Sequence, residues 1–60
     1  MYEIWSGWNG GFNTEKVAEF ATEKEARAYA KEHDYVGMWK FTCGEEGYDL
    51  RKPSGKTVEL

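Results

Sequence analysis

The stretch TEKEARAYAKEHD, from Thr22 to Asp34, decides the fold of this chain. Thr22 and Glu25 form a capping box, in which the threonine hydroxyl accepts a hydrogen bond from the Glu25 amide and the glutamate carboxylate reaches back to the Thr22 amide. Behind this box, residues at the i, i+3, i+4 and i+7 spacing form a narrow stripe on one helix face: Ala26, Tyr29, Ala30 and His33. The pattern predicts a helix of about three turns that ends near His33 or Asp34, with small side chains that allow close approach to a sheet.

Strand-like segments lie on both sides of this helix. Before it, Tyr2 to Ser6 or Trp8 and Thr14 to Ala21 are expected to pair through the tight turn Asn9-Gly10-Gly11. After it, Tyr35 to Cys43 is the strongest strand candidate. A turn at residues 44–47, a short strand from Tyr48 to Arg51, a turn at residues 53–55 and an edge strand from Thr57 to Leu60 follow. We therefore expect one domain over residues 1–60, an α+β fold in which a single antiparallel sheet of four to five strands carries one helix on one face, in the order ββαββ(β).

Aromatic side chains supply most of the apolar mass. The chain has three Trp, four Tyr and three Phe among its 60 residues, and each such ring can bury roughly 150–250 Å². A disulfide within the chain is excluded because Cys43 is the only cysteine. Because His33 and Cys43 are the only soft ligands, no metal ion and no cofactor are predicted. The rings must therefore stabilise either the fold itself or a complex.

The charge pattern limits the partners. The net charge is −3, and no basic stripe is present that could neutralise phosphates, so nucleic acid is a less favoured partner than protein. The sequence contains no apolar run of membrane length and no basic segment followed by an apolar run at its start. We expect a cytoplasmic protein with no membrane partner, and a reduced Cys43 fits that compartment.

The strand prediction for Tyr35 to Cys43 leads to an interface hypothesis. A two-residue period makes both faces of this strand apolar, and it places Trp5 of the first strand on the face opposite Tyr2 and Ile4. A sheet that is apolar on both faces is normally covered on both, whereas a single helix covers one. We therefore predict that the second face binds a second copy of the chain or another protein through five aromatic residues: Trp5, Trp8, Tyr35, Trp39 and Phe41.

Candidate catalytic features have simpler interpretations. A strand, not a helix N-terminus, follows the glycine-rich segment Gly7–Gly11, so it is a turn rather than a phosphate loop. Cys43 is expected to be a small buried hydrophobe at a strand end, and His33 can bond the last carbonyls of the helix. Glu45 and Glu46 are expected to be solvated in a turn. No catalytic residue is predicted, and the chain is expected not to be an enzyme.

Nucleic-acid binding is the alternative function. Exposed rings on a flat sheet stack the bases of single strands, and Trp5, Trp39 and Phe41 could do so from the open face. Lys16 and Lys40 are the only basic residues within the long predicted strands. Protein binding is therefore preferred.

A local resemblance concerns the helix and the strand before it. Residues Phe12 to Glu32, about a third of the chain, resemble the strand-to-helix passage of small sheet-type DNA-binding modules, such as the plant ethylene-response-factor domain and the arm-binding domains of tyrosine recombinases. The matching residues are Phe20, Thr22, Glu25, Ala26 and Tyr29. Those families read DNA with arginines and tryptophans on the strands, whereas here no arginine precedes Arg27. The resemblance thus implies how the helix packs on the sheet.

In general character the chain is also similar to the small accessory proteins of phages, which are short, acidic, aromatic-rich and without a catalytic signature. Many of those proteins inhibit host enzymes or defence systems by binding them. We accordingly predict a small non-enzymatic protein-binding module, a homodimer that acts as a phage-type inhibitor of a host defence protein through an aromatic sheet face. Its compartment would then be the host cytoplasm.

Overall fold

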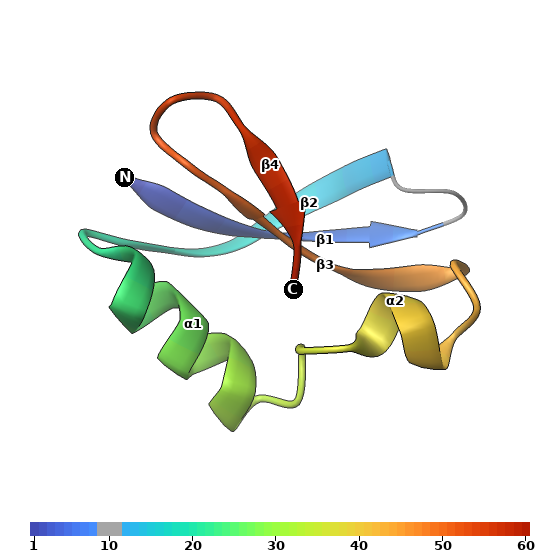
Figure 1. Ribbon diagram of the computed structural model, residues 1–60. Coiled ribbons are helices and arrows are strands. Elements are labelled where there is room, and N and C mark those ends of the chain that lie inside the picture. Colours follow the sequence, from blue (N-terminus) through green and yellow to red (C-terminus); the bar gives the residue numbers. More distant parts are fainter. Residues whose placement is uncertain (9–11) are drawn as a thin grey trace.

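A computed structural model of the chain describes residues 1–8 and 12–60, and it confirms a small α+β fold with one antiparallel sheet (Figure 1). The strands lie side by side in the order β2-β1-β3-β4, so β2 and β4 form the two edges. The described elements are β1 (Tyr2–Trp8), β2 (Phe12–Phe20), α1 (Glu23–Glu32), α2 (Met38–Phe41), β3 (Glu46–Arg51) and β4 (Thr57–Glu59). The predicted turn Asn9-Gly10-Gly11 lies outside the described residues.

The core forms where α1 crosses the central strands. Ile4 of β1 pairs with Leu50 of β3, and both side chains are completely buried. Ala26 and Ala30 of α1 are buried against them, together with Leu60. Burying a side chain such as Ile4 or Leu50 contributes about 1.5–3 kcal/mol. The small alanines let the helix approach the sheet closely, as the sequence predicts.

The ends of α1 also follow the sequence. Thr22 is the N-cap, and its Oγ1 accepts a hydrogen bond from the Glu25 amide at 3.2 Å. The carboxylate of Glu25 accepts a bond from the Thr22 hydroxyl at 3.0 Å, whereas the sequence predicted a bond from the Thr22 amide. At the other end His33 is the C-cap, and Asp34 adopts a left-handed φ of 60° that turns the chain out of the helix.

The strand predicted from Tyr35 to Cys43 is wrong, because this segment contains the short helix α2. Gly37 precedes the helix with a φ of 79°, and Cys43 and Gly44 follow it with φ values of 58° and 85°. A short apolar run does not by itself distinguish a strand from a buried helix turn. The left-handed residues on both sides interrupt any extended conformation, so the segment coils between them.

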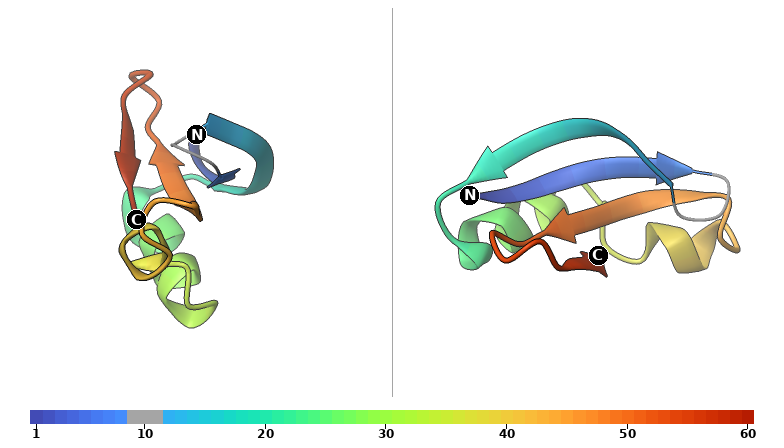
Figure 2. Two further views of the ribbon diagram at one scale, coloured as in Figure 1. Left: turned by 90° about the vertical axis from the view of Figure 1, so that its right-hand side faces the viewer. Right: turned by 90° about the horizontal axis from the view of Figure 1, so that it is seen from above.

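Helix α2 lies beside β3, next to the place where β4 ends, as the view from above shows (Figure 2). The Thr42 hydroxyl donates to the carbonyl of Glu46 at 2.6 Å and accepts from its amide at 3.0 Å. The Gly37 amide bonds the carbonyl of Leu60 at 3.1 Å, and the Leu60 amide bonds that of Tyr48 at 3.0 Å. These bonds hold α2 at the sheet, on the side of the molecule away from α1 along the strands.

Candidate binding surface

The five residues predicted for the interface lie in three different environments. Trp39 is buried, Trp5 is half-buried on the sheet face away from α1, and Trp8 and Phe41 are strongly exposed. Tyr35 is half-buried in the connection between α1 and α2. The structure therefore brings only part of the predicted set together.

Trp39 belongs to the interior of the fold. Its side chain is 7% exposed, and its indole N–H donates to the Asp49 carboxylate at 2.7 Å. The ring lies against Gly47, which has no side chain to hold it away. Because Trp39 sits on a helix and not on the predicted strand, its ring turns inward while Phe41, two residues on, points outward and is 85% exposed. We therefore leave Trp39 out of the candidate surface.

Trp5 is engaged within its own sheet. Its indole N–H donates to the Glu3 carboxylate at 2.8 Å, and the guanidinium of Arg51 lies 4.4 Å from the centre of its ring. Strand alternation places Trp5 on the face opposite Ile4, as predicted from the sequence. The cation over the ring makes this side chain part of a polar cross-strand cluster rather than an open apolar patch.

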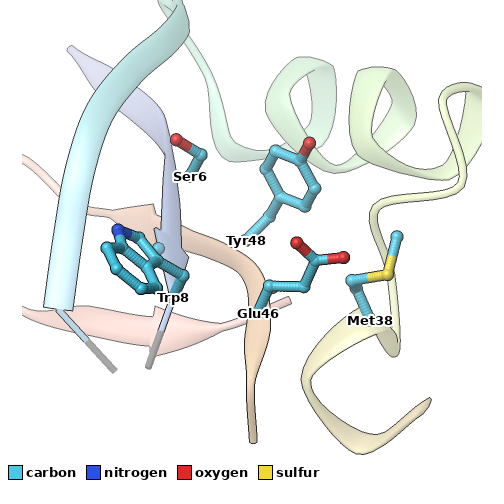
Figure 3. A pocket seen from close by; sticks show the side chains of 7 residues that line it. Ser6, Trp8, Met38, Glu46 and Tyr48 are labelled. Atoms are coloured by element: carbon cyan, nitrogen blue, oxygen red, sulfur yellow. The ribbon is translucent and has the colours of Figure 1, made fainter. Parts of the chain in front are cut away.

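A hollow opens on the α1 side of the sheet, over the part that α1 does not cover (Figure 3). It has a volume of about 210 Å³. Strands β1 and β3 supply its floor, and Met38 of α2 stands at one side. The lining residues are Ser6, Gly7, Trp8, Met38, Glu46, Gly47 and Tyr48. Strand alternation explains the arrangement, since these strands also present Ile4 and Leu50 to α1 on the same face.

Tyr48, which lines this hollow, lies at the end of a row of contacting aromatic rings. Tyr48 stacks on Tyr35 with ring centres 3.7 Å apart and planes 14° from parallel. Tyr35 in turn contacts His33 and Tyr29, at 5.6 and 6.1 Å between ring centres, and Tyr29 contacts Phe20 at 5.2 Å. Burial and the neighbouring Tyr48 raise the pKa of Tyr35 above its ordinary value. Tyr48 is therefore held in place by packing from α1 and the connection that follows it.

A second, shallower hollow adjoins the first. It has a volume of about 360 Å³ and is lined by Asp34, Val36, Gly37, Met38 and Phe41. Met38 lines both hollows, so the two lie next to each other. Val36 and Trp8 are each 57% exposed. We call this region, made of Trp8, Tyr48, Met38, Val36 and Phe41, the Trp8–Phe41 surface.

The charged residues that line the two hollows are acids. Glu46 lines the first hollow and Asp34 the second, and no lysine or arginine is among the described lining residues. The described part of the chain contains no group of three or more His, Cys, Asp or Glu residues that could hold a metal ion. Cys43 is exposed in the turn after α2, not buried at a strand end as predicted. The surface is therefore apolar with an acidic edge.

Sequence reasoning missed Met38, Tyr48, Val36 and Glu46 as site residues. In the predicted strand from Tyr35 to Cys43, Val36 and Met38 would lie on the face opposite Phe41. For that reason they were not included in the predicted interface. The signal that could have found them is the pair Gly37 and Gly44, which brackets a segment of helical length and favours a local turn of helix. With that segment as a helix, Phe41 and Trp39 separate onto opposite sides.

Comparison with known proteins adds no further information on the site, because no family model, no curated protein and no solved structure matches the chain. No helix in residues 1–8 and 12–60 is long and apolar enough to cross a membrane.

Proposed function

We propose that the chain is a small non-enzymatic protein-binding module and that the Trp8–Phe41 surface is its contact site. The observation that carries the proposal is that three strongly exposed apolar side chains, Phe41 at 85% and Val36 and Trp8 at 57% each, line two hollows that share Met38. Contiguous exposed apolar groups with a polar rim are typical of interaction sites. Single exposed side chains would need no such explanation.

The physical character of the surface supports protein rather than a small substrate. Tryptophan and tyrosine anchors in the centre of an interface can each contribute about 2 kcal/mol or more, and Trp8 and Tyr48 stand at the first hollow. The described lining residues provide one carboxylate and two hydroxyl groups, Glu46, Ser6 and Tyr48, and no histidine or cysteine. This set lacks the adjacent nucleophile and base that covalent catalysis requires.

The predicted homodimer and the predicted inhibition of a host protein remain proposals. A homodimer would cover the Trp8–Phe41 surface with a second copy, and a phage-type inhibitor would cover it with a host protein. Nucleic acid, the predicted alternative, is less suited to this surface, because Glu46 and Asp34 would repel phosphates.

The test compares Phe41→Ser with Lys40→Ser. Both residues are exposed on α2, but of the two only Phe41 lines either of the hollows described above. Light scattering during size-exclusion chromatography measures self-association over a range of concentrations, and affinity capture from nuclease-treated lysate measures other partners. We expect Phe41→Ser to abolish the association that the parent chain shows and Lys40→Ser to retain it. Equal behaviour of both variants would refute this contact site.

A further inference from the structure

We infer that the first hollow receives the guanidinium group of an arginine side chain on the partner protein. This inference rests on the proposed function, since it names the chemistry by which that contact site selects its partner. The second hollow, with Val36 and Phe41, would then take apolar side chains next to that arginine. Three side chains that line the hollow would make the contacts: Trp8, Glu46 and Tyr48.

The strand register brings these three side chains to one place. Trp8 is directly opposite Glu46, and Ser6 is directly opposite Tyr48, in the antiparallel pair of β1 and β3. All four point to the same face and line the same hollow. Side chains directly opposite each other in such a pair lie within about 4.5–5.5 Å at their Cβ atoms. In Figure 3 the Glu46 carboxylate lies near Tyr48 on the Met38 side of the hollow, and the Trp8 ring lies on the opposite side.

The carboxylate of Glu46 has no hydrogen-bond or ion-pair partner among the side chains of residues 1–8 and 15–60, since the bonds that Thr42 makes to Glu46 go to its backbone. No described lining residue is basic. The hollow therefore combines one negative charge with two aromatic side chains, Trp8 and Tyr48. That combination favours a cation and disfavours phosphate or carboxylate groups.

A guanidinium fits this environment better than an ammonium ion. It is planar, so it stacks on an aromatic face while its edge donates two parallel hydrogen bonds to a carboxylate. The protein already contains a guanidinium over an aromatic ring on the other face of the sheet, where the Arg51 guanidinium lies 4.4 Å from the centre of the Trp5 ring. The volume of about 210 Å³ is below the roughly 300–1,000 Å³ of small-molecule sites, which suits a single side chain.

The test uses three capped tripeptides that differ at the central residue: arginine, lysine, or citrulline, the neutral isostere of arginine. Titration is followed by the backbone amide signals of Gly7 and Gly47, which line the hollow and are present in every variant, in two-dimensional nitrogen–proton NMR spectra. We expect saturable binding of the arginine peptide in the millimolar range, with the citrulline peptide about five- to tenfold weaker and the lysine peptide weaker than arginine. Equal binding of arginine and citrulline, or tighter binding of lysine, would overturn the inference.

Substitutions at the lining residues test whether the peptide binds in this hollow. Glu46→Gln and Trp8→Leu should each weaken the arginine peptide about fivefold or more, and both side chains are exposed, so the core is untouched. Glu45→Gln is the matched control, because Glu45 is the neighbouring exposed acid and does not line the hollow. An equal loss with Glu45→Gln would mean that general acidity, not this hollow, attracts the peptide, and the inference would fail.

The peptide titration and the partner assay can fail separately. If Phe41→Ser abolishes association with a partner while the arginine peptide does not bind, the proposed function stands and the arginine inference fails. If the peptide binds in the manner expected while association is unaffected by Phe41→Ser, the arginine site stands and the proposed contact site fails.

Discussion

Gly47→Ala should destabilise the protein, because the ring of Trp39 occupies the space that a side chain would need. A Cβ atom on Gly47 would lie 2.7 Å from Cδ1 of Trp39 and closer still to Cγ and Cδ2. The ring cannot move away freely, because its N–H is bonded to the buried Asp49 at 2.7 Å. Forcing an extra carbon into such a site costs about 1–3 kcal/mol.

That cost is large for a domain of this size. At about 0.05–0.15 kcal/mol per residue, a chain of 60 residues has roughly 3–9 kcal/mol of stability in total. Each kcal/mol lowers the melting temperature of a small domain by about 4–8 °C. Gly47→Ala should therefore lower Tm by roughly 4–24 °C, measured by circular dichroism at 222 nm, and alter the near-ultraviolet signal of the displaced ring.

A gain in stability for Gly47→Ala would refute this reasoning. Where nothing obstructs the new methyl group, Gly→Ala at a compatible backbone position stabilises a protein by about 0.4–1 kcal/mol. An unchanged or higher Tm for Gly47→Ala would thus show that Trp39 does not rest on this glycine. Glu45→Ala, at an exposed position two residues earlier, serves as the control and should change stability by no more than about 0.5 kcal/mol.

Three further predictions concern the helix cap, the cation over Trp5 and the response to acid. Thr22→Ala should cost about 0.5–2 kcal/mol through loss of the N-cap bond, and an unchanged urea midpoint would contradict that role. Arg51→Met should cost about 0.5–1 kcal/mol and change the fluorescence of Trp5; an unaltered emission spectrum would argue against the stacked pair. The hydrogen bond from Arg27, with a smaller effect of Lys52, lowers the pKa of Glu23. The stabilisation from these contacts is therefore present above the ordinary pKa of 4.5 and is lost as the pH falls through the lowered pKa. Arg27→Gln should therefore reduce the difference in urea midpoint between pH 7 and pH 3, and an undiminished difference would count against it.

The sequence was sufficient to predict α1 and most of the sheet. The Thr22 capping box and the alanine stripe act through neighbouring residues on one helix, so they can be recognised without tertiary information. The strands β1, β3 and β4 were expected within one or two residues of their observed ends, and β2 begins earlier than predicted. Alternating or aromatic segments between turn residues are the local signal that made this possible.

The segment around Trp39 could not be assigned from local pattern alone. Aromatic and β-branched residues favour strands, and by that measure residues 35–43 form the best strand in the chain. Its conformation depends on a contact distant in sequence, the bond from Trp39 to Asp49 and the stacking on Gly47. Because helix and strand place Trp39 and Phe41 on different sides, this one error changed which residues were expected on the surface. Trp8 and Phe41 remain candidates, whereas Trp39 became part of the interior.

The double hydrogen bond of the Thr42 side chain has a consequence for how the protein behaves at high concentration. Open backbone groups along the outermost strand of a sheet are templates on which other chains can add as further strands. Along β3, the backbone of residues 49–51 is paired with β4, the Tyr48 carbonyl accepts from Leu60, and the Thr42 hydroxyl saturates both polar groups of Glu46. The Thr42 hydroxyl thus makes the two backbone hydrogen bonds that a residue of a neighbouring strand would otherwise make. Thr42→Val would keep the size of the side chain, expose the N–H and C=O of Glu46 to another molecule, and create a starting point for aggregation.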